Sequence, residues 1–115
     1  MTRAEIATMI AGVGIPYAFD HFDDEDGAHP QGLPFICFML SARDDFHADN
    51  GNYVKVAQLV IELYTDDPDF TLEAAVESAL TTAGLGYQRG DQSYIDSEQM
   101  YQTIYNTEVL LTDGQ

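Results

Sequence analysis

The chain has 115 residues, 45% of them apolar, and its twenty acidic and four basic residues give a formal net charge of −16. This length and apolar content predict one folded domain, residues 1–115, rather than a disordered acidic tail. Four scattered basic residues exclude stable binding to nucleic acid or to an anionic membrane surface, and no apolar run reaches the roughly 18 residues of a membrane span.

The first predicted element is a helix that begins after Thr2. Thr2 and Glu5 have the spacing of a capping box, apolar residues then recur at helical spacing up to Val13, and Gly12 with Gly14 ends the helix. A short extended segment, "IPYAFDHF", follows it.

An acidic segment comes next, between two histidines. Aligning Gly27 with the glycine of an EF-hand loop places Phe22 at position 1 and Leu33 at position 12, where calcium needs oxygen ligands. Neither histidine has the three or four partners that a transition metal requires. The sequence therefore predicts a solvated loop that binds no ion, and its acidic residues are Asp20, Asp23, Asp24, Glu25 and Asp26.

Two strands follow, at 34–41 and 53–65, separated by a predicted loop over 42–52. In "PFICFMLS" both alternating faces are apolar, so both must be covered, and the single cysteine, Cys37, is predicted to be a buried thiol in a reducing compartment. In "YVKVAQLVIELYT", Val56 has the opposite parity to Leu59, which predicts a bend or a bulge near Ala57 and Gln58.

The clearest helix lies in "DDPDFTLEAAVESALTTAG". Asp67 is the predicted N-cap with Pro68 at the first helical position, and Gly84 ends the helix. "GYQR" and "SYID" then flank a turn at Gly90 and Asp91, and "MYQTIYNTEVLLT" forms the last strand.

The order α-β-β-β-α-β-β predicts an α+β fold, a mainly antiparallel sheet with two helices packed on one face. Because two strands are apolar on both faces, we expect a second copy of the chain to cover the other face, with a self-covering hairpin or curved sheet as the alternative. The predicted subunit-interface residues are Phe35, Phe38, Leu40, Tyr53, Val54, Val56, Tyr101 and Tyr105.

Motifs for chemistry are missing from the sequence. It has no glycine-rich phosphate loop, no G-x-S-x-G elbow and no HExxH pair, so we expect neither an enzyme nor a cofactor. A small ion-binding or catalytic module stays a minor hypothesis. An acidic DNA mimic that inhibits a DNA-binding enzyme is the alternative suggested by the charge.

The order of four blocks resembles a known family. "AGVGIPYAFDHF", "PFICFML", "ADNGNYVKVAQLVIELYTDDPD" and "YIDSEQMYQTIYNTEVLL" are similar, over nearly the whole chain, to small tail proteins of siphophages and prophages of Gram-positive bacteria. The resemblance implies a tail terminator or tail-completion protein, comparable in fold to the lambda-type tail terminator.

The resemblance also implies partners and a location. It implies a ring of identical subunits, expected to be a hexamer, that caps the tail tube and joins it to the head. The expected partners are the major tail tube protein and a head completion or connector protein. The expected location is the virion tail, after assembly in the cytoplasm of the bacterial host. The acidic loop would then face the lumen, the solvent or a partner ring.

Overall fold

The computed structural model describes residues 1–19, 32–47 and 53–112 and confirms the α+β fold. Between 85 and 95 the chain forms two short strands, each of which pairs with the last strand and not with the other, so the sheet has one strand more than predicted. The elements are α1 (Arg3–Ala11), β1 (Tyr17–Phe19), β2 (Phe35–His47), β3 (Tyr53–Thr65), α2 (Phe70–Thr82), β4 (Tyr87–Arg89), β5 (Ser93–Ile95) and β6 (Met100–Leu111).

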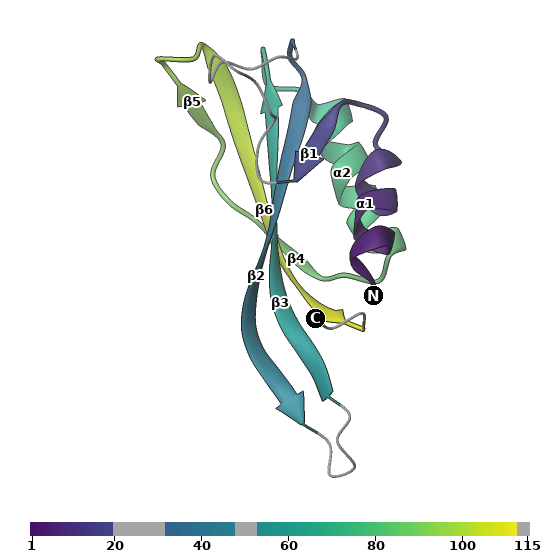
Figure 1. Cartoon of the computed structure of the whole chain (residues 1–115). Coiled ribbons are helices and arrows are strands. Elements are labelled where there is room, and N and C mark those ends of the chain that lie inside the picture. Colours follow the sequence, from purple (N-terminus) through teal and green to yellow (C-terminus); the bar gives the residue numbers. More distant parts are fainter. Residues whose placement is uncertain (20–31, 48–52, 113–115) are drawn as a thin grey trace.

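The six strands form one twisted sheet in the order β1-β2-β3-β6-β4, with β5 also paired to β6. β1 runs parallel to β2, and the remaining pairs are antiparallel. Both helices lie against the same face of this sheet, as predicted (Figure 1).

The main core lies between the helices and the sheet. Alternate residues of each strand point to this side, and α1 and α2 contribute apolar residues at helical spacing, so the burial follows the two sequence periods. The buried members are Ile6, Ile10, Ile36, Phe38, Ala57, Leu59, Ile61, Leu63, Val76, Leu80, Tyr105, Val109 and Leu111.

A second, smaller core lies on the other face of the sheet. Phe35, Cys37 and Met100 are buried there, with Tyr64 and Ile95 packed beside them. The two-sided apolar pattern of 34–41 is therefore confirmed, and Cys37 is buried as predicted.

The capping of α1 is as predicted. The Glu5 amide donates to Thr2 Oγ1 at 3.1 Å, and the Thr2 amide donates to Glu5 Oε1 at 2.8 Å. This reciprocal pair satisfies two of the amides that a helix start leaves without intrahelical partners.

The N-cap of α2 is Asp69, so the predicted cap at Asp67 is wrong. The helix begins at Phe70, and Asp69 Oδ1 accepts the Leu72 amide at 3.0 Å. At its other end Gly84 has φ +79°, and its amide donates to the Thr81 carbonyl at 3.0 Å. The next amide, of Leu85, donates to the Leu80 carbonyl, which completes a Schellman motif.

The predicted loop at 42–52 is wrong for its first six residues, because β2 continues to His47. The bulge lies on β2 and not on β3. Ala42 pairs with Ala57 and Asp44 pairs with Val56, which leaves Arg43 as the extra residue. The change in side-chain alternation along β3 therefore predicted the correct position along the hairpin, but the extra residue lies on β2.

The β2–β3 hairpin continues past both helices (Figure 1). We call residues 42–47 with 53–55 the arm. The radius of gyration is 15.3 Å, compared with about 13 Å expected for a compact chain of this length. The longest extent is 51 Å. The arm therefore makes the subunit elongated.

Candidate functional site

The candidate site is the face of the sheet opposite the helices. No described helix lies on that side (Figure 1), and the second core covers it at one end only. We call the remainder the open face. Its residues are Met39, Ser41, Val56, Gln58, Val60, Gln88, Asn106, Glu108 and Leu110.

The register of the strands brings these residues together. Directly paired residues point to the same side of a sheet, and the β3–β6 pairs on this side include Val60 with Asn106 and Val56 with Leu110. Leu110 is 55% exposed, while Val56 beside it is 8% exposed. The open face therefore carries exposed apolar surface at its end nearest the arm.

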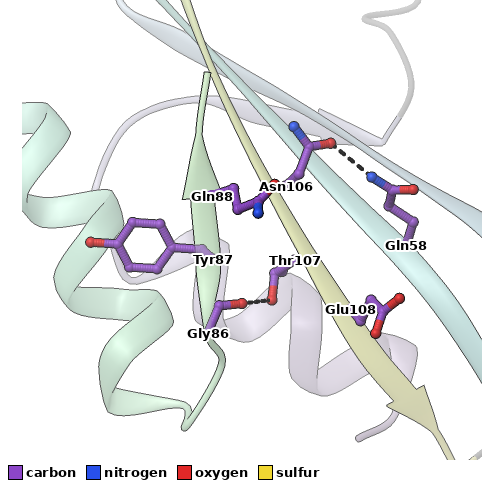
Figure 2. Close-up of a pocket in the computed structure, with 7 residues that line it drawn as sticks. All are labelled: Gln58, Gly86, Tyr87, Gln88, Asn106, Thr107 and Glu108. Carbon is purple, nitrogen blue, oxygen red and sulfur yellow. Dashed lines mark hydrogen bonds between the residues drawn. The ribbon is translucent and has the colours of Figure 1, made fainter. Parts of the chain in front are cut away.

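A shallow recess of about 480 Å³ lies across β3, β6 and β4. Gln58 Nε2 donates to Asn106 Oδ1 at 3.0 Å within it, and Thr107 Oγ1 donates to the Gly86 carbonyl. In Figure 2 the ring of Tyr87 points toward the helices, away from Gln58. The full lining is Gln58, Gly86, Tyr87, Gln88, Asn106, Thr107 and Glu108.

The lining of this recess consists of hydrogen-bonding groups. It offers amide donors and acceptors, one hydroxyl and the Glu108 carboxylate, with neither an imidazole nor a thiol among the lining residues. Amide groups of this kind form hydrogen bonds to another polypeptide without proton transfer.

Beyond the open face, the covered end has its own polar network. The Tyr64 hydroxyl donates to Glu62 Oε1 at 2.9 Å and accepts from Gln102 Nε2 at 2.9 Å. The Tyr64 ring stacks on Phe35 with ring centres 4.9 Å apart. Burial, and then the hydrogen bond to Glu62, raise the pKa of the Tyr64 hydroxyl above its ordinary value.

A second polar network joins α2 to the sheet on the helix side. Glu73 is only 5% exposed, and its carboxylate accepts from Arg89 Nη2 at 2.7 Å and from Gln92 Nε2 at 2.9 Å. The Tyr105 hydroxyl donates to Glu77 Oε2 at 2.8 Å. Burial, and then this hydrogen bond, raise the pKa of the Tyr105 hydroxyl. The network holds α2 in place and belongs to the stability of the fold.

The predicted interface residues separate into three groups. The first group is buried in the two cores of the subunit itself and consists of Phe35, Phe38 and Tyr105. Leu40 is half-buried and packs against the main core. Val56 lies on the open face, and Tyr101 lies half-buried against Tyr94, with ring centres 4.9 Å apart.

The other predicted site residues have no described side chains. Tyr53 and Val54 are placed as backbone in β3. The acidic segment, with Asp20, Asp23, Asp24, Glu25 and Asp26, lies outside the described residues. Sequence reasoning missed Leu110, although its parity, opposite to that of Val109 and Leu111, is the signal that places it on the open face.

Two further observations bear on the class of protein. Within residues 1–19, 32–47 and 53–112, no three His, Cys, Asp or Glu side chains are grouped so that they could hold a metal ion. Neither helix of the described chain is long and apolar enough to cross a membrane.

No protein-family model matches the sequence, and no curated protein matches it. The functional inference therefore depends on the geometry of the open face and the arm, together with the resemblance between sequence blocks.

Proposed function

We propose that the chain is a structural protein of a phage or prophage tail, a tail terminator or head–tail joining subunit. Copies of it form a ring that caps the tail tube and connects the tube to the head. This extends the resemblance of the four sequence blocks to small siphophage tail proteins.

The observation that carries the proposal is the two-sided construction of the subunit. Helices cover one face of the sheet, whereas the opposite face is open and an arm projects past the helices (Figure 1). A closed ring requires heterologous contacts, in which each subunit offers two different surfaces to its two neighbours. A subunit with one arm and one open face has two such surfaces.

The charge is compatible with this role. Each subunit carries −16, so a ring of several copies concentrates negative charge around its channel. Acidic groups lining the channel would repel passing DNA, an effect that salt limits to about 8 Å at physiological ionic strength. The same negative charge disfavours stable binding of DNA to the ring, so DNA can pass through the channel.

The test is to stop expression of the chain in the phage that encodes it and to examine the particles by electron microscopy. A missing cap should give tail tubes of irregular length that are not attached to heads, and supplying the chain from a plasmid should restore normal virions. Virions of normal length and infectivity without the chain would contradict the proposal.

A further inference from the structure

The most exposed large apolar side chain of the described residues is Phe70, at the first position of α2. It is 77% exposed, it belongs to neither core, and it makes no ring contact within the described chain. The exposed rings of β1, by contrast, pack on Phe38, and the ring of Tyr94 packs on Tyr101. The described fold therefore leaves the Phe70 ring free to contact another molecule.

The backbone that carries Phe70 is fixed by local bonds. Pro68 has a restricted φ, and Asp69 Oδ1 accepts the Leu72 amide at 3.0 Å. The Asp69 carbonyl accepts the Glu73 amide at 3.0 Å, and Glu73 is itself held by the network between α2 and the sheet. A surface that is ordered before binding loses less conformational entropy when a partner binds it.

The turn before Phe70 is strongly acidic. Asp66 and Asp67 are exposed, and neither forms an ion pair with a cation of the described chain. Asp69 directly precedes the phenylalanine. A partner that buries the ring must approach these carboxylates, so Lys or Arg around its pocket would favour association, whereas acidic residues there would oppose it.

A second copy of this chain is a poor source of such basic residues. The chain has four of them against twenty acidic residues, with a formal net charge of −16. Arg89 is already paired with Glu73 at 2.7 Å. Two copies also repel one another through their net charge. The charge of the turn therefore favours a different protein as the partner.

The turn also lies away from the arm. β3 begins in the arm at Tyr53 and ends at Thr65, directly before the turn, and its 13 residues extend over about 40 Å at roughly 3.3 Å per residue (Figure 1). A ring subunit needs one set of surfaces for its neighbours in the ring and another for the protein that the ring caps. The turn is separate from the arm and can serve the second purpose.

We propose that the turn 66–70 is a docking surface for a different protein, and that Phe70 enters an apolar pocket whose rim carries Lys or Arg side chains. This inference rests on the proposed tail function, in which that protein belongs to the tail tube or to the head. It names a contact surface of the ring that is distinct from the contacts between its subunits.

A binding experiment with tail tubes and heads tests this docking. Both are purified from phage made without the chain, and co-sedimentation measures the dissociation constant of the labelled chain added to them. Phe70→Ala should raise this constant at least about tenfold, whereas Phe70→Leu keeps apolar bulk and should raise it less. Asp66→Lys with Asp67→Lys should also raise it at least about tenfold, because positive charge would then face the basic rim.

Tyr94→Ala is the matched control. It removes another exposed ring, 50% exposed, and leaves the turn unchanged, so this variant should bind like the wild type. Native mass spectrometry should show the same self-assembly for Phe70→Ala as for the wild type, since the turn contacts a different protein. Circular dichroism and urea unfolding check that each variant is folded. Asp66→Asn with Asp67→Asn serves as the milder charge variant if the lysine variant unfolds.

The possible results separate this docking from the tail role. A Phe70→Ala variant that binds and restores virions like the wild type would overturn the docking and leave the tail role intact. Loss of self-assembly in Phe70→Ala would show that a second copy covers the ring, and would also overturn it.

The remaining results are equally decisive. A wild-type chain that binds neither tubes nor heads, an equal loss of binding in Tyr94→Ala, or a lysine variant that binds as tightly as the wild type would each overturn the docking. Binding that depends on Phe70, together with normal virions in the absence of the chain, would support the docking and remove the tail role.

Discussion

Arg89 Nη2 lies 2.7 Å from Glu73 Oε1, an ion pair that links the edge strand β4 to the helix α2. Glu73 is nearly buried, whereas the Arg89 side chain is 38% exposed. The carboxylate therefore depends on its arginine and glutamine partners to offset its desolvation.

Replacing Arg89 with alanine should destabilise the fold by about 1–3 kcal/mol, since it leaves Glu73 buried without its cation. Solvent around Arg89 keeps the cost below that of a fully buried pair. The double replacement Arg89→Met with Glu73→Met should recover most of the loss. Urea unfolding measures the free energy of unfolding of both variants. An Arg89→Ala variant as stable as the wild type would show that the ion pair does not stabilise the fold.

The N-cap of α2 gives a prediction with an internal control. Asp69→Ala should cost about 1 kcal/mol, because it removes the acceptor of the Leu72 amide. Asp67→Ala, which the sequence alone marks as the cap, should change the free energy of unfolding by less than about 0.5 kcal/mol. Equal effects of the two substitutions would contradict the observed helix start.

Gly84 gives a prediction about backbone conformation. Its φ of +79° is unfavourable for any residue with a Cβ, although a Cβ there would meet no atom within 4 Å. Gly84→Ala should therefore cost about 1 kcal/mol from the backbone alone. Gly86→Ala has the same open surroundings without the positive φ and should be close to neutral. Thermal unfolding of both variants measures the difference.

The two tyrosines with raised pKa predict a loss of stability in alkali. The folded chain holds the hydroxyl protons of Tyr64 and Tyr105 more tightly than the unfolded chain, where tyrosine has a pKa of about 10. Their contribution is complete below about pH 10 and is lost as the pH rises further.

Tyrosinate absorbance and alkaline unfolding measure this effect together. Two of the seven tyrosines, Tyr64 and Tyr105, should ionise together with the unfolding transition. The double variant Tyr64→Phe with Tyr105→Phe should lose less stability between neutral and alkaline pH than the wild type does. Ionisation of all seven before any unfolding would contradict the burial of these two hydroxyl groups.

Hydrophobic periodicity was enough to predict most of the fold. The parity of Ile36 and Phe38 against that of Phe35 and Cys37 predicted two apolar faces, and both are present. The capping box at Thr2 was readable because both of its partners are local in sequence. These features depend on short-range patterns, which a single sequence carries.

Features that depend on pairing partners were not readable. Residues 42–47, with Arg43, Asp44 and Asp45, have little strand propensity, and they form a strand because β3 lies opposite them. The bulge was assigned to the wrong strand because parity does not tell which of two paired strands carries the extra residue.

The candidate site was predictable only as a statement about faces. Alternation identifies the two sides of a strand but not which side the helices cover. Phe38 and Tyr105 were therefore predicted to lie at a subunit interface, whereas their side chains are buried in the core of the subunit. The recess requires Gln58, Gln88 and Asn106 from three strands, and their proximity follows from the strand order β3-β6-β4. That order is a property of the whole fold.

The most direct test of the proposed ring is the mass of the wild-type assembly in solution, measured by native mass spectrometry over a range of concentrations. The account predicts a closed assembly of identical subunits. A chain that stays monomeric at every concentration would contradict the account.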